Sequence, residues 1–201
     1  MKKILTFIII LFVSGCTVVR IDTDSIDNIV DVILTNESRL HNRVGQGFKY
    51  YIPRGVIHVD TDGLNDRLYS NGNFYFLYVD VVSYYHEIVS SFEENQHAYF
   101  SRRISTENGF RHDGFLEITK NDEWYHMVFA YNFAQIEAVV SRRDLNNTVL
   151  DAAYILSTIQ FNSAVISLRL DEAHFTNREE RYDGFSRNET TGNTFLPVEN
   201  D

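Results

Sequence analysis

The 201-residue chain contains a single cysteine and only two prolines. One thiol can form neither an intramolecular disulfide nor a zinc site built from several cysteines. Basic residues are also few, with 18 Lys and Arg against 28 Asp and Glu, so the formal net charge is −10. A chain this acidic lacks the cationic surface that neutralises phosphates, which predicts no nucleic-acid partner. With 44% hydrophobic residues, the composition is still that of a folded globular protein.

The longest apolar run in the chain is short and lies at its N-terminus. Lys2 and Lys3 precede residues 4–13, ILTFIIILFV, in which Thr6 is the one polar residue. Ten residues of helix reach roughly 15 Å, about half the thickness of a hydrocarbon core of roughly 30 Å. A run of this length behind two positive charges is typical of the hydrophobic region of a signal peptide.

The residues that end this run, Val-Ser-Gly-Cys at 13–16, resemble the bacterial lipobox. The resemblance implies that residues 1–15 are a lipoprotein signal peptide removed before Cys16. It also implies a diacylglyceryl group on the Cys16 thiol and a fatty acyl chain, such as palmitate, on the new amino group. Thr17 rather than Asp follows, which by resemblance to diderm sorting implies no retention at the inner membrane. The alternative is a plain signal peptide, or a signal anchor with a coincidental cysteine.

Cleavage before Cys16 changes the charge of the remaining chain. Loss of Lys2 and Lys3 leaves 16 basic and 28 acidic residues, a net charge of −12. Anionic headgroups repel such a body, so the lipid rather than a basic patch must hold it at the membrane. We therefore expect the membrane to be contacted through the lipid on Cys16. The expected location is the extracytoplasmic face of the cell membrane, or the outer membrane in a diderm host.

The sequence predicts one α+β globular domain over residues 24–170, preceded by a tether over residues 16–23. A helix is expected over Ser25–Asn36, because apolar residues recur there at helical spacing on one stripe. The stripe consists of Ile26, Ile29, Val30, Ile33 and Leu34. We expect it to pack on the domain. A helix lying on the membrane is the alternative, against which the neighbouring aspartates and the absence of lysine argue.

Short turns and β-type runs dominate the middle of the domain and predict an antiparallel sheet. The polar residues 40–47 are expected to form a linker, and Asn71-Gly72 predicts a two-residue hairpin. The strands are expected at 48–52, 56–60, 67–70, 74–82, 98–105, 110–119, 123–131 and 134–142. Residues 83–95 are ambiguous, with apolar spacing closer to that of a helix. Because the turns are short, a meander is the economical topology.

A second helix is expected after residue 144, where Asp144, Asn146 or Asn147 offers an N-cap. Its inner face is predicted to consist of Val149, Ala152, Ala153 and Leu156. The two alanines would let this helix approach a sheet closely. The alternation in Ile159–Phe161 and Ile166–Leu170 predicts a last strand. Residues 171–201 contain few apolar side chains and are expected to be a disordered polar tail.

No pattern in the sequence predicts a catalytic or metal site. The seven histidines form no HExxH or HxxxH motif, and GxSxG and GxGxxG are absent. His58 and Asp60 are expected on one strand face, where such a pair could bind metal or exchange protons; two exposed polar residues beside a turn are the simpler interpretation. Residues 60–66 are similar to a calcium loop, but Leu64 and Asn71 occupy ligand positions. We predict no catalytic residue, metal or cofactor, with a hydrolase as the less favoured alternative.

Aromatic side chains are the most unusual feature of the composition, with 12 Tyr, 15 Phe and one Trp. One interpretation is that these side chains belong to a sheet that is covered by helices on one face and by loops on the other. The alternative is a partner or ligand surface, because Tyr and Trp are enriched at interfaces. The candidates for such a surface are Tyr84, Tyr85, Tyr99, Trp124, Tyr125 and Tyr131.

The order of predicted elements resembles the PsbP/Mog family of α/β/α sandwiches. Residues 48–56, FKYYIPRGV, are similar to the opening strand and turn of that family, and 154–161, YILSTIQF, to its closing helix and strand. The resemblance implies an antiparallel meander flanked by an N-terminal and a C-terminal helix. Because members mostly bind or stabilise other proteins, it implies a non-enzymatic accessory module with an envelope protein as partner. A lipoprotein that binds a small ligand or solute in an aromatic cleft is the alternative function.

Overall fold

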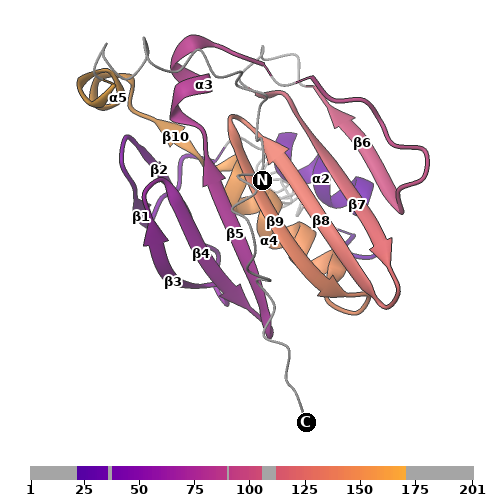
Figure 1. Ribbon diagram of the computed structural model, residues 1–201. Coiled ribbons are helices and arrows are strands. Elements are labelled where there is room, and N and C mark those ends of the chain that lie inside the picture. The colour runs from indigo at the N-terminus through magenta and orange to yellow at the C-terminus, as the bar shows by residue number, and fades with distance from the viewer. Residues whose placement is uncertain (1–21, 36–37, 90, 106–111, 171–201) are drawn as a thin grey trace, which may run out of the picture.

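The computed structural model describes residues 22–35, 38–89, 91–105 and 112–170 (Figure 1). The predicted signal peptide, Cys16, most of the tether, the start of the strand predicted over 110–119 and the polar tail lie outside the described residues. Within these ranges, no helix combines the length and the apolar character needed to cross a membrane.

Two antiparallel sheets form the framework of the described part of the chain. The large sheet has seven strands in the order β3-β4-β5-β9-β8-β7-β6, and the small sheet has three in the order β1-β2-β10. Their bounds are Arg43–Val44 (β1), Phe48–Tyr50 (β2), Ile57–Asp62 (β3), Asn65–Ser70 (β4), Asn73–Val79 (β5), Phe100–Ile104 (β6), Gly114–Asn121 (β7), Trp124–Tyr131 (β8), Ala134–Ser141 (β9) and Gln160–Phe161 (β10).

The large sheet consists of two meanders rather than the one that the sequence predicts. Strands β3 to β5 form the first and β6 to β9 the second, and β5 pairs with β9 at their junction. After β5 the chain therefore leaves the centre of the sheet and returns at the far edge with β6. The antiparallel prediction is confirmed, whereas the single meander is wrong, because short turns do not exclude one long crossover.

The helices α2 (Ile26–Thr35) and α4 (Leu145–Ser157) lie against the same face of the large sheet, and both match predicted helices (Figure 1). Four residues of the predicted stripe of α2 are buried and Ile26 is half-buried, as expected for packing on the domain. On its outer side, Arg102 of β6 donates hydrogen bonds to Asp27 at 2.9 Å and to Asp31 at 2.5 Å. Ala152 and Ala153 of α4 are fully buried, which places this helix close to the strands.

Alternation along the central strands separates the core from the opposite face. In β5, Tyr75, Leu77 and Val79 are buried, whereas Phe74 is exposed and Phe76 is half-buried. Successive strand residues point to opposite faces, so the buried set faces α2 and α4. The hydrophobic core therefore lies between one face of the large sheet and these two helices.

Two short helices occur at positions where the sequence predicts strands. Val81 and Val82 belong to α3 (Val81–His86), because the Asp80 carboxylate accepts a hydrogen bond from the Ser83 amide at 2.8 Å and caps a helix there. Residues 166–169 belong to α5 (Ser163–Arg169). Asn162 caps α5 in the same way, through the Val165 amide at 3.2 Å. The predicted linker over 40–47 also contains a strand, β1.

We expect neighbouring positions of β5 to respond very differently to truncation. Leu77→Ala removes a fully buried side chain and should lower the free energy of unfolding by about 2–5 kcal/mol. Phe74→Ala alters a side chain that is 44% exposed and should cost about 1 kcal/mol or less. Chemical denaturation of both variants measures the difference. Equal losses would contradict the assignment of the two faces.

Candidate functional site

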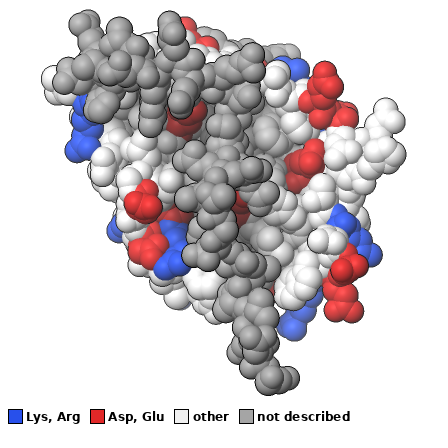
Figure 2. Space-filling view, in the orientation of Figure 1, with Lys and Arg blue, Asp and Glu red and all other residues white. Residues whose placement is uncertain are grey.

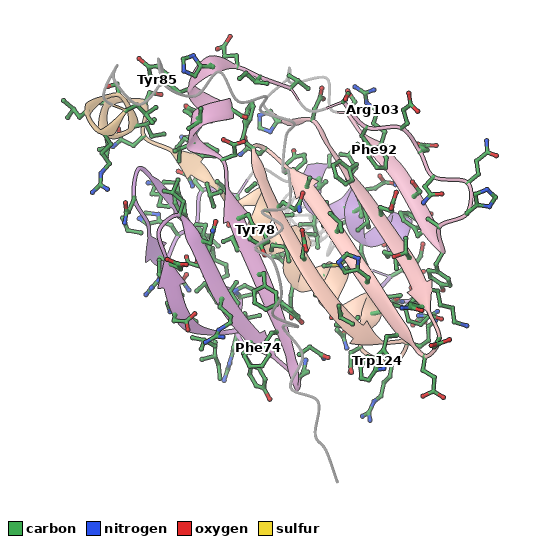
Figure 3. The ribbon with its side chains drawn as sticks, in the orientation of Figure 1. Phe74, Tyr78, Tyr85, Phe92, Arg103 and Trp124 are labelled. Atoms are coloured by element: carbon green, nitrogen blue, oxygen red, sulfur yellow. The ribbon has the colours of Figure 1, made fainter. Side chains whose placement is uncertain are left out.

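The six aromatic residues singled out in the sequence do not form one surface. Tyr85 on α3, Tyr99 before β6 and Trp124 on β8 are exposed by 43%, 44% and 54%. Figure 3 places Tyr85 and Trp124 at opposite ends of the molecule. Tyr99 packs edge-on against Tyr125, with ring centroids 4.9 Å apart. These three exposed side chains therefore lie at separate places on the surface and do not line one cleft.

The other three candidates are buried. The Tyr84 ring stacks on Phe161 at 4.0 Å, and its hydroxyl lies 3.0 Å from Ser163 Oγ. Tyr125 and Tyr131 point to the helix-covered side of β8, where both are buried. Aromatic character alone does not reveal the face that a strand residue occupies, so composition could not separate the two groups.

The face of the large sheet that points away from α2 and α4 is the broadest candidate surface. We call it the open face, because no helix in the described ranges lies against it (Figure 1). Its central side chains are Phe74, Phe76 and Tyr78 of β5, Glu137 and Val139 of β9, and Trp124, His126 and Val128 of β8. Figure 3 shows Phe74, Tyr78 and Trp124 spread over this side. The open face thus combines exposed apolar groups with titratable ones.

One end of the open face is an aromatic cluster with its own charges. The Tyr69 and Phe74 rings lie 5.2 Å apart, and the Arg67 guanidinium sits 5.6 Å above the Phe74 ring. Arg67 also donates a hydrogen bond to Asp60 on β3. A cation held over an aromatic ring and paired with a carboxylate is fixed in position. This end of the face is therefore pre-formed.

Acidic side chains lie in the middle of the open face. Across the strands, Phe76, Glu137, Val128 and Glu117 form one row, so each carboxylate is next to an apolar side chain. Glu137 accepts a hydrogen bond from the Gln135 amide at 2.7 Å, and its other oxygen lies 3.8 Å from His126 Nε2. Where described residues are visible in Figure 2, side chains of both charge signs are interspersed with uncharged surface.

A second polar cluster lies on the other side of β3, and it corrects the predicted pairing of His58 with Asp60. A β-bulge between these residues sends them to opposite faces. His58 instead lies 3.2 Å from Asp66 Oδ1, at the junction of the two sheets. No sequence pattern indicates this pair, because the bulge alters the alternation from which the face of a strand residue is predicted.

Asp66 is the centre of this cluster and is 4% exposed. Its carboxylate accepts hydrogen bonds from the Tyr50 hydroxyl at 2.5 Å and from the Thr61 hydroxyl. Burial alone would raise the pKa of Asp66, but the hydrogen bonds from Thr61 and Tyr50 lead the opposing effects and hold this pKa below the ordinary 3.8. Burial and the nearby carboxylate raise the pKa of Tyr50, so its hydroxyl stays protonated as a donor.

The pKa of a second carboxylate, that of the half-buried Asp151 on α4, is shifted in the opposite direction. It lies 3.2 Å from Ser70 Oγ and 3.3 Å from the Tyr75 hydroxyl, both on the sheet. Burial raises the pKa of Asp151 above 3.8, because two neutral donors do not replace the lost hydration. Burial likewise raises the pKa of Tyr75 to about 12.

The described residues offer little to a metal or a small ligand. Among them, no group of three or more His, Cys, Asp or Glu side chains converges as a metal site would require. The calcium-like residues 60–66 form a tight hairpin between β3 and β4 instead, with Gly63 at a φ of +62°. A cavity of about 380 Å³ near the β4–β5 hairpin is lined by Asn71, Arg143, Asp144 and Asn147. Its lining is polar, unlike an aromatic cleft.

No family model matches the sequence, and no curated protein matches it either. The candidate sites therefore depend on the geometry described above.

The shifted pKa values of Asp66 and Asp151 predict opposite dependences of stability on pH. A lowered pKa means that Asp66 stabilises the fold above about pH 3.8 and that this stabilisation is lost as the pH falls further. Asp66→Asn should therefore destabilise the protein at pH 7, by about 1–3 kcal/mol for unsatisfied partners, and less at pH 3. Thermal unfolding at the two pH values measures this.

Asp151→Asn is the matched control, because the pKa of Asp151 is raised. Stability from a raised carboxyl pKa is complete below about pH 3.8 and is lost as the pH rises through the folded-state pKa. The variant should therefore unfold at a higher temperature than wild type at pH 7 and lose this advantage at pH 3. Parallel pH responses of the two variants would refute both assignments.

Proposed function

We propose that this chain is a lipid-anchored extracytoplasmic bacterial lipoprotein that acts as a non-enzymatic interaction module. The observation that carries the proposal is the open face, where Phe74, Val139 and Trp124 are exposed by 44%, 38% and 54%. Exposed apolar groups rimmed by polar ones mark surfaces that bind other macromolecules. The lipid on Cys16 would hold this face near other envelope proteins.

The anchor is supported by the sequence alone, because residues 1–21 lie outside the described part of the chain. The cationic start, the ten-residue apolar run and the small residues before Cys16 agree with one another. An acidic body of net charge −12 has no electrostatic affinity for anionic lipids, so a covalent lipid explains membrane attachment more simply than surface charge does.

The partner is proposed to be an envelope protein with an apolar surface that carries basic groups. Arg67 on the open face is already paired with Asp60, so acidic Glu117 and Glu137 dominate the centre. Their carboxylates flank Val128, and the net negative charge of the body adds to their field. Electrostatic complementarity of this kind raises association rates and selects the partner.

A PsbP/Mog-like sandwich is part of the same proposal at the level of fold. The order of α2, antiparallel strands and α4 supports it, as does the strand and turn over 48–56. Because α2 and α4 lie on one face, they do not provide the helical layers on both faces that the name describes. An experimental structure of the complete mature chain would decide between the sandwich and a two-layer relative.

The anchor makes a direct prediction for the mature protein. Mass analysis of protein purified from membranes should find an N-terminus at Cys16 carrying a diacylglyceryl group. Cys16→Ala should remain uncleaved and should lack the lipid, because the thiol is the attachment point. Ser14→Ala keeps a small residue before the cysteine and is the matched control that should still be processed. An unmodified thiol at position 16 of the native protein would refute the anchor.

The open face makes a separate prediction, tested with a photo-crosslinking amino acid in intact cells. Placed at Val139, it should capture one envelope protein reproducibly. At Leu168, which is 86% exposed on α5 beyond the small sheet, it should not. Glu117→Lys with Glu137→Lys should reduce the Val139 adduct at least tenfold. An adduct that survives charge reversal, or forms equally from Leu168, would contradict the proposed surface.

A further inference from the structure

One ring nitrogen of His58 meets three polar groups at the junction of the two sheets. His58 Nε2 lies 2.8 Å from Arg43 Nη2, 3.0 Å from Thr61 Oγ1 and 3.2 Å from Asp66 Oδ1. The side chain of His58 is 17% exposed and that of Asp66 is 3% exposed. This contact lies away from the open face and does not depend on the lipid anchor.

A single nitrogen cannot satisfy all of these neighbours at once. Arg43 can only donate a hydrogen bond, so its contact requires a lone pair on Nε2. The carboxylate of Asp66 can only accept, so its contact requires a hydrogen on the same nitrogen. The shortest of the three contacts is the one to Arg43, and it is the contact that a neutral ring with its hydrogen on Nδ1 can make.

We propose that His58 is a proton-operated switch that exchanges its partner between the two sheets. The neutral ring accepts a hydrogen bond from Arg43 of β1 and so ties the small sheet to β3. The protonated ring donates to Asp66 of β4, and its positive charge repels Arg43. Taking up one proton therefore strengthens a contact within the large sheet and removes one between the sheets.

The groups around the His58 ring favour either its neutral or its protonated form. Arg43 from β1 opposes the added positive charge, and Asp66 from β4 favours it. Tyr50 from β2 donates to the second oxygen of Asp66, which keeps that carboxylate ionised and in place. Thr61 donates to Asp66 and lies 3.4 Å from Arg43 Nη2, but it is neutral and therefore adds no charge beside the ring.

The rest of the junction confines the change to β1. Tyr50 still holds β2 through Asp66, and the Tyr51 amide donates to Thr158 Oγ1 at 3.0 Å beyond α4. Arg43 is the residue of β1 whose side chain hydrogen-bonds to the large sheet in the described part of the chain. Imidazole is the side chain whose charge changes between pH 5 and 8, so the switch would report the acidity of the solution around the protein.

The test combines ring nitrogen NMR with hydrogen exchange on the full-length protein in detergent. At pH 8 the His58 Nε2 signal should be that of an unprotonated nitrogen, and at pH 5 that of a protonated one. The amides of Asn42 and Gly45, which bond to Tyr50 and Phe48 across β1 and β2, should lose protection at least threefold over the same range. Protection is corrected for the intrinsic pH dependence of exchange.

His58→Gln should make the protection of these amides independent of pH, because glutamine does not titrate in this range. His126→Gln, on the open face, is the matched control and should keep the wild-type response. A hydrogen on Nε2 at pH 8 would overturn the proposal, as would a pH response that persists in His58→Gln. If that variant fails to fold, the ring signals of the wild-type protein decide alone.

Discussion

The fit of α4 against the large sheet is the constraint on which the rest of the molecule depends. Val149, Ala152 and Ala153 are fully buried, and the small side chains bring the helix close to β8 and β9. This contact fixes which face of each central strand belongs to the core. Because successive side chains of a strand alternate between its two faces, the remaining side chains of each central strand must lie on the opposite face. The open face is thus a direct consequence of the core.

Local sequence patterns were sufficient to predict the elements whose conformation depends on their own residues. The stripe of α2 and the inner face of α4 follow a helical period, and both helices formed where that period predicted them. The hairpin at Asn71-Gly72 needs positive φ at both residues, and the structure has +50° and +86° there. These elements depend on contacts within a few residues, so the sequence was enough to locate them.

The sequence was insufficient wherever a distant partner or a single cap decides the outcome. Val81 and Val82 favour a strand by residue type, yet one carboxylate at Asp80 starts a helix. The pairing of β5 with β9 joins segments about 60 residues apart, and no local signal specifies it. Tyr84 and Tyr85 are neighbours of the same type, but only Tyr84 is buried, because α3 turns it toward Phe161.

The bulge in β3 shows how a single extra residue serves both faces of the sheet. Without it, Asp60 would occupy the register position opposite Asp66, and two carboxylates would meet at the junction of the sheets. Like charges directly across a strand pair are destabilising. The extra residue places Thr61 opposite Asp66 instead, and Asp60 opposite Arg67. The same irregularity therefore completes the hydrogen bonds of a buried carboxylate and neutralises a cation on the open face.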